Sequence, residues 1–277
     1  MFEALTNPNV PFLRYALIAG VLASVSFGIT GTYVVTRRIS FIAGAISHSV
    51  LGGVGFSLFM SSKYGWTWFS PMAGATLAAL SAALIIGFVS LYASEREDTV
   101  IGTVWAVGMS LGLLFISATP GYVDPMSYLF GNILLITKED LSFIAVLDVV
   151  TLGNVVLFYN KFLAVCFDEE FVRLRNIKAR FYYIFLLCLI ALTVVLLIRI
   201  VGIVMVIALL TIPPAVANNF TRKISTMMIF SVILCMFFTV SGIAVSYTFE
   251  LPAGPSIILI SGITFLFVAT MRFFKTR

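Results

Sequence analysis

The sequence predicts an all-α integral membrane protein with about nine transmembrane helices. Of its 277 residues, 61% are hydrophobic and only 10% are charged, and the mean hydropathy is +1.10. A soluble domain carries about 25% charged residues, so this chain has too few charges to cover a surface that faces water. Its apolar runs are about 20 residues long, the length that crosses a bilayer as a helix.

Short polar segments separate the first four apolar runs. Paired arginines follow the first run, Lys63 follows the second, and the charged stretch SEREDT follows the third. Within that stretch, Asp98 and Thr99 are suited to cap the next helix. The four predicted spans cover residues 12–35, 42–61, 66–92 and 99–118.

Five further runs follow residues 119–140, which Gly and Pro interrupt and which we predict to lie outside the spans, with YLFGNILL as a short half-buried helix. In the seventh run, Pro213 and Pro214 are predicted to break the helix. The carbonyls freed near Leu209 and Leu210 then need partners, so this region is predicted to be buried or to line a cavity. Only Arg199 separates the sixth run from the seventh; the five spans cover 141–163, 181–198, 200–218, 226–247 and 255–272.

The basic residues orient these spans. With the N-terminus outside and the C-terminus inside, the inner loops hold thirteen of the 17 Lys and Arg residues, and only Arg14, Lys63, Lys138 and Arg199 remain outside. This bias follows the positive-inside rule, so the net charge of +5 needs no nucleic acid to explain it. We expect a single transmembrane domain over residues 1–277, with inside loops at 36–41, 93–98, 164–180 and 219–225.

His48 is the only histidine, and it lies in the second predicted span. Helical spacing places Gly44, Gly52 and Gly55 on the same face, with Ser47 beside it. Small residues on a membrane helix face another helix or a cavity rather than lipid, and neutral imidazole is a common ligand of transition-metal ions. The alternative is a histidine that hydrogen-bonds across a helix interface.

Asp148 is a second candidate because an ionisable group within a span is costly and is usually functional or paired. The alternative is a carboxylate near a helix end that reaches water. Counting about 1.5 Å per residue from the predicted span ends, Asp148 and His48 differ in depth by about 10 Å in a core about 30 Å thick. We therefore expect successive stations on one path rather than one shared site.

The longest inside loop contains FDEEFVRLRNIKA, which predicts a short amphipathic helix at about 167–178. Its acidic start and basic end complement the helix dipole. Such a helix lies either on the membrane surface or in a protein groove, and the carboxylates at its start favour the groove. The predicted docking residues are Phe167, Asp168, Glu169, Glu170, Phe171, Arg173, Leu174 and Arg175.

Together these segments resemble a known family. GTYVVTRRISFIAGAISHSVLGGVGF, EDTVIGTVWAVGMSLGLLFIS, YLFGNILLITKEDL, FDEEFVRLRNIKA, VGIVMVIALLTIPPAVA and ELPAGPSIILI occur in the order seen in permease subunits of bacterial ABC importers for zinc, manganese and iron, the metal ABC-3 type. Each segment alone is weak, but six in order are specific.

The resemblance implies a helical fold like that of the cobalamin-importer (type II) permeases, in the bacterial cytoplasmic (inner) membrane. It also implies a homodimer with the ion path at its axis, a cytoplasmic ABC ATPase subunit and an extracytoplasmic metal-binding receptor. The loop 167–178 becomes the coupling helix that fits the ATPase, and His48 becomes a metal contact, with Asp148 and Ser47 as further candidates. The ion is transported cargo, so no tightly bound cofactor is expected.

One position departs from the family pattern. Many members have Asp one turn before the histidine, whereas this chain has Gly44. Asp148, Ser47, Asn154 or the His48 of a second copy then has to compensate, or the ion passes with few protein ligands. Two imidazoles without a carboxylate suit zinc slightly better than manganese, and we therefore expect zinc, with manganese or iron as alternatives.

Other functions fit the sequence less well. No G-x-x-x-x-G-K-[ST] phosphate loop is present, so ATP hydrolysis is assigned to a separate subunit, and we expect no enzymatic activity in this chain. A secondary, ATP-independent metal transporter is the main alternative. It requires its own coupling-ion site, for which few intramembrane acids are available.

Overall fold

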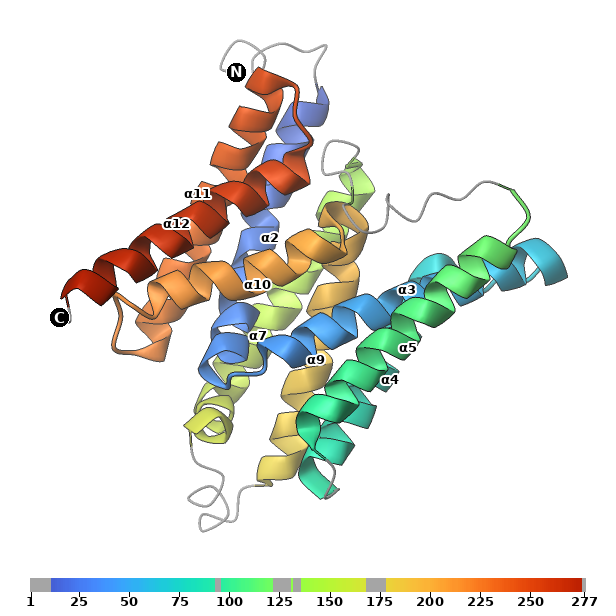
Figure 1. The fold of residues 1–277 in the computed structure, drawn as a ribbon, viewed down its shortest axis with the longest axis horizontal. Coiled ribbons are helices and arrows are strands. Elements are labelled where there is room, and N and C mark those ends of the chain that lie inside the picture. Colours follow the sequence, from blue (N-terminus) through green and yellow to red (C-terminus); the bar gives the residue numbers. More distant parts are fainter. Residues whose placement is uncertain (1–10, 93–95, 122–130, 132–135, 168–177, 276–277) are drawn as a thin grey trace. The chain divides into compact units, whose positions relative to one another are not determined.

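The structure is a computed structural model, and it describes residues 11–92, 96–121, 131, 136–167 and 178–275 (Figure 1). These residues form nine α-helices, and no strand occurs among them. The helices are α2 (Pro11–Thr36), α3 (Ser40–Tyr64), α4 (Pro71–Tyr92), α5 (Glu97–Ala118), α7 (Lys138–Phe167), α9 (Ala179–Val201), α10 (Ile203–Ala217), α11 (Ile224–Phe249) and α12 (Ala253–Lys275).

The helices belong to two compact units. The first consists of Met1–Thr36, Phe130–Gly153 and Arg199–Arg277, so it contains α2, α10, α11, α12 and the first half of α7. The second consists of Arg37–Leu129 and Asn154–Ile198, and it contains α3, α4, α5, the second half of α7 and most of α9. In the first unit α2 packs on α10 and α11, and in the second α3 packs on α4 and α5 (Figure 1).

The all-helical membrane fold is confirmed. Seven of the described helices are long and apolar enough to cross a bilayer, and two shorter apolar helices lie at Ala179–Val195 and Ile203–Ala217. The third predicted span begins later than expected. Gly65, with a φ of 68°, ends α3, and α4 starts only at Pro71, a residue whose fixed φ and missing N–H suit the first turn of a helix.

The boundary between the sixth and seventh predicted spans was placed wrongly at Arg199. Helix α9 continues through this residue to Val201, and the break falls at Gly202, whose φ is 80°. Arginine is a good helix former, whereas a positive φ is readily adopted only by glycine. The backbone also comes close here, because a Cβ on Gly131 would lie 2.4 Å from the backbone nitrogen of Gly202.

The predicted helix break at Pro213 and Pro214 was also wrong. Both prolines lie inside the continuous helix α10. They deprive the carbonyls of Leu209 and Leu210 of their usual N–H partners. Helix α10 can continue because neighbouring helices lie against these carbonyls. With 15 residues it is about 22 Å long, which is shorter than a hydrocarbon core of about 30 Å.

Two neighbouring helices approach the carbonyls that the prolines release. The buried Cys235 on α11 donates a hydrogen bond from Sγ to the Leu209 carbonyl at 3.6 Å. Gly31 on α2 comes so near the Leu210 carbonyl that a Cβ would lie 2.4 Å from its oxygen. The prediction that this region is buried is therefore confirmed, since Leu209 and Leu210 are almost fully enclosed.

Glycines set the spacing of α3, α4 and α5. A Cβ on Gly53 of α3 would lie 2.0 Å from the Gly74 carbonyl oxygen on α4, and a Cβ on Gly74 would lie 2.3 Å from that of Gly53. On the side toward α5, a Cβ on Gly52 would lie 2.8 Å from the Gly108 oxygen. The helix backbones are in direct contact, which is how small residues hold membrane helices together.

Candidate functional site

His48 lies on the face of α3 that packs against α5. The side chain is half-buried, and its Nδ1 is buried without a hydrogen-bond partner in the part of the chain that the structure describes. The sequence prediction that His48 points toward another helix or a cavity is confirmed. The predicted alternative was a histidine that hydrogen-bonds across a helix interface, and Nδ1 makes no such bond among the described residues.

Trp105 on α5 makes the principal ring contact of His48. The two ring centroids are 4.4 Å apart and the ring planes differ by 17°, so the imidazole and the indole are stacked. The indole also covers Gly44, where a Cβ would lie 3.0 Å from Cζ3 and 3.4 Å from Cη2 of Trp105. The indole therefore occupies the space in which a side chain at position 44 would begin.

Sequence reasoning did not identify Trp105 as a site residue. The signal was its position, because it is the one of the three tryptophans that lies in the middle of an apolar run. Trp66 and Trp68 lie between α3 and α4. Which residue contacts a tryptophan within a span depends on which helices pack together. The sequence alone does not predict these packing partners.

Ser47 is fully buried next to His48 in the chain. Its hydroxyl donates to the Ala43 carbonyl at 2.8 Å, one turn back in the same helix. The hydroxyl proton is therefore engaged in a hydrogen bond within α3. Ser47 can contact an ion only through the lone pairs of its hydroxyl oxygen.

Asp148 lies in the first compact unit, whereas His48 lies in the second. Its side chain is only 6% exposed, so it is not a carboxylate that reaches water at a helix end. Ser26 on α2 donates to Oδ1 at 2.5 Å, and the same hydroxyl is 3.5 Å from Oγ1 of Thr151. Oδ2 is buried without a hydrogen-bond partner in the described chain.

A closed metal cage is absent from the described residues. No group of three or more His, Cys, Asp or Glu side chains in these residues could hold an ion. His48 Nδ1 and Asp148 Oδ2 are both buried without a hydrogen-bond partner among the described residues. The arrangement can make a weak, incomplete contact with an ion.

The predicted docking helix falls almost entirely on residues 168–177, which lie outside the described residues. Of its predicted docking residues, only Phe167 is described. It is the last residue of α7, and its ring is largely exposed.

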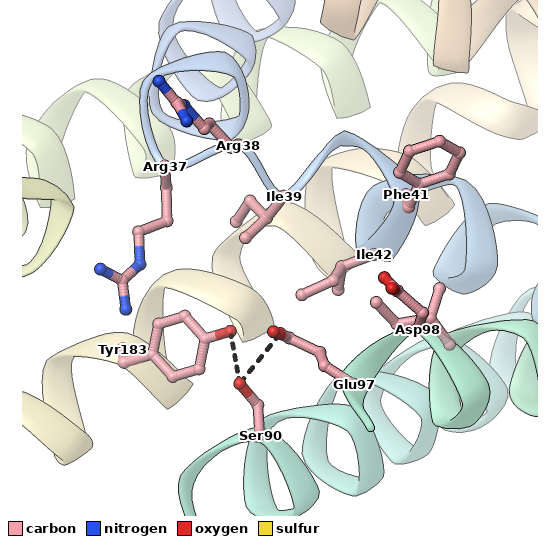
Figure 2. Close-up of a pocket in the computed structure, with 10 residues that line it drawn as sticks. Arg37, Arg38, Ile39, Phe41, Ile42, Ser90, Glu97, Asp98 and Tyr183 are labelled. Carbon is pink, nitrogen blue, oxygen red and sulfur yellow. Dashed lines mark hydrogen bonds between the residues drawn. The ribbon is translucent and has the colours of Figure 1, made fainter. Parts of the chain in front are cut away.

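Charged groups gather at the end of the second unit where α3, α5 and α9 begin and α4 ends. A pocket of about 280 Å³ is lined there by arginines from the α2–α3 turn and by carboxylates from the first turn of α5 (Figure 2). Figure 2 shows Tyr183 of α9 and Glu97 converging on Ser90 of α4, whose hydroxyl donates to Glu97 at 2.9 Å and lies 3.5 Å from the Tyr183 hydroxyl.

The opposite end of the same helices carries aromatic residues. Tyr64, Trp66 and Trp68 are exposed around the turn from α3 to α4. Tryptophan and tyrosine are enriched at membrane–water interfaces. The unit therefore has one charged end and one aromatic end, as expected if its helices cross a bilayer between them.

Comparison with known proteins supports a transport function. Residues 9–272 match the model of the ABC 3 transport family. A "Probable metal transport system membrane protein" of Chlamydia pneumoniae is 39% identical over 266 residues, covering 95% of this chain and 90% of that protein. The "Manganese transport system membrane protein MntC" of Listeria monocytogenes is 32% identical, covering 92% of this chain and 88% of that protein.

A solved structure shows the same architecture. The chain matches "PsaBC from Streptococcus pneumoniae in complex with Fab" with a TM-score of 0.81 and 28% identity, over 93% of this chain and 90% of that one. The two chains therefore share one helical architecture over nearly their full length.

Proposed function

The chain belongs to the ABC 3 transport family, and on this premise we propose that it is the membrane-spanning permease subunit of an ATP-driven importer for a divalent transition-metal ion. The observation that carries the proposal is His48, the single histidine of the chain, whose half-buried ring lies on a glycine-lined face of α3. A transported ion has to leave its ligands again, so an incomplete site suits transport better than a closed cage.

The proposed complex has three further components. A cytoplasmic ATPase supplies the phosphate loop that the sequence lacks, and it docks on the loop 167–178. An extracytoplasmic receptor delivers the ion. A second copy of the permease completes the path, so that two His48 side chains face the ion.

Asp148 and Ser47 are proposed as secondary contacts. The buried Oδ2 of Asp148 is a carboxylate oxygen without a hydrogen-bond partner in the described chain, and it offers a station separate from His48. Ser47 contributes lone pairs only, because its proton is bonded to Ala43.

Two observations bear on the metal. The chemistry of an imidazole site without a carboxylate favours zinc. Relatives from Listeria monocytogenes and Streptococcus gordonii carry manganese in their names, at 32% and 30% identity. We propose that both ions are tested as cargo in the same assay.

The permease is expected to accumulate metal only with ATP. The test uses the permease co-purified with its ATPase, reconstituted in liposomes, with the receptor loaded with radioactive zinc or manganese. We expect uptake that requires ATP and the receptor, because the permease by itself has no energy source. The competing secondary transporter predicts uptake by the permease alone, driven by a proton gradient without ATP, and that result would overturn the proposal.

The orientation is expected to be N-terminus outside and C-terminus inside, as the distribution of basic residues predicts. Lys63 and Lys138 are exposed positions on the proposed outer side, and Arg96 is exposed on the proposed inner side. A membrane-impermeant thiol reagent should label Lys63→Cys and Lys138→Cys in intact spheroplasts, but Arg96→Cys only after permeabilisation. Labelling of Arg96→Cys in intact spheroplasts would show that the predicted orientation is wrong.

A further inference from the structure

Trp105 and His48 form a stacked pair inside the membrane-spanning part of the second unit. We propose that Trp105 is the positioning residue for His48, and that its indole, seated on Gly44, holds the imidazole in the plane in which it meets the passing ion. This inference rests on the proposed function, because it assigns a role at the same site.

Three residues, Gly44, His48 and Trp105, lie in contact at this site. Gly44 and His48 are one turn apart on α3, and the indole of Trp105 lies against both: 3.0 Å from a Cβ at position 44, and with its centroid 4.4 Å from that of the imidazole. A Cβ at Gly44 would crowd the indole, which would have to shift by a few tenths of an ångström. A larger residue there would push the indole away from His48.

The stack replaces the contact that usually orients such a histidine. A histidine that binds metal almost always donates its other ring N–H to a carboxylate, a carbonyl or water, which fixes the ring and makes the ligand more basic. Nδ1 of His48 has no such partner among the described residues. Burial of Nδ1 leaves Nε2 as the nitrogen that this proposal assigns to the ion, with the stacked indole fixing the plane of the ring.

Orientation by stacking has a consequence for transport. Among the described residues, the stack holds the ring and Nδ1 has no hydrogen bond of the kind that strengthens a histidine ligand. The ion is therefore met by a directed but weak donor, which favours rapid release.

Beyond this pair, glycines rather than aromatic rings form the interface between α3 and α5. Farther along the helices, glycines bring the backbones together, and a Cβ on Gly55 would lie 2.6 Å from the Gly112 oxygen. At the level of His48 the interface instead holds an aromatic ring parallel to the imidazole. Leucine would be apolar there too, but only an aromatic ring can stack.

Uptake by matched variants separates stacking from packing. Trp105→Phe keeps an aromatic face and should keep most of the uptake. Trp105→Leu keeps an apolar side chain without the face, and Gly44→Val displaces the indole. Each of these two should lower the maximal uptake rate by about 10-fold, the lower end of what loss of an orienting partner costs a metal site. Membrane abundance and association with the ATPase should equal those of the unmodified chain.

Fluorescence provides a readout that packing alone would not move. Trp66→Phe with Trp68→Phe leaves Trp105 as the sole tryptophan. Paramagnetic Mn²⁺, added at millimolar concentration to the purified complex, should quench Trp105 emission when His48 is present. The quenching should disappear with His48→Ala, while emission in the absence of metal should change because the stack is lost.

The outcomes distinguish this inference from the proposed function. If the unmodified complex shows no ATP-dependent uptake, the proposed function fails. If His48→Ala is inactive while Trp105→Leu transports at the normal rate, the proposed function stands and the positioning role is wrong. Mn²⁺ quenching that persists in His48→Ala would also overturn the positioning role.

Discussion

Replacement of His48 by alanine is expected to abolish metal uptake while the complex still assembles. The imidazole is the one nitrogen ligand that the spans can offer, since no other histidine occurs in the chain. Loss of an outer partner of a metal ligand already costs about 10–100-fold, so loss of the ligand should reduce the uptake rate by more than about 100-fold. Uptake of radioactive zinc and manganese, in a strain without its own importer, measures the effect.

His48→Phe is the matched control for this prediction. Phenylalanine keeps a flat ring that can stack on Trp105 but has no nitrogen, so the packing is retained and the ligand is lost. Both variants should be equally inactive at normal membrane abundance. Uptake that survives in His48→Phe would show that the ring acts through packing and that the ion finds its ligands elsewhere.

Gly53→Ala is expected to prevent stable folding of the second unit. A Cβ at this position would lie 2.0 Å from the Gly74 carbonyl oxygen and 2.5 Å from its carbon. These are backbone atoms, so no rotamer change relieves the clash and α3 and α4 have to separate. Overpacking typically costs about 1–3 kcal/mol and occasionally more, and we expect about 3 kcal/mol or more here, a large part of a typical net stability of about 5–15 kcal/mol. Membrane abundance and the unfolding temperature in detergent measure the loss.

Gly102→Ala provides the comparison within the same unit. Gly102 is an exposed residue of α5, and beyond its chain neighbours and the backbone of its own helix no described atom lies within 4 Å of a Cβ at this position. Alanine is favoured over glycine in a helix by about 1 kcal/mol, so this variant should be as stable as the unmodified chain or slightly more stable. Equal unfolding temperatures for Gly53→Ala and Gly102→Ala would contradict the direct backbone contact between α3 and α4.

The sequence by itself determined the class of fold and the approximate spans. Hydropathy is a property of consecutive residues, and a bilayer of fixed thickness requires helices of about one length. The spans could therefore be predicted from the sequence alone. The same holds for the single histidine: its glycine neighbours at helical spacing predicted a face that packs inward, and Trp105 of α5 covers that face in the structure.

The tertiary structure alone decided where helices break and which side chains meet. Pro213 and Pro214 were expected to break a helix, but α10 is continuous because Cys235 and Gly31, from two other helices, lie against the carbonyls that the prolines release. Arg199 was expected to mark a boundary that Gly202 provides through its positive φ.

The contacts of the candidate site likewise depend on which helices pack together. Asp148 meets Ser26, 122 positions earlier in the chain, and His48 meets Trp105 on another helix. Such contacts follow from which helix faces pack together. Helix pairing in a membrane depends on close shape fit between small residues, whereas the hydropathy that predicts the spans is nearly the same for every apolar face.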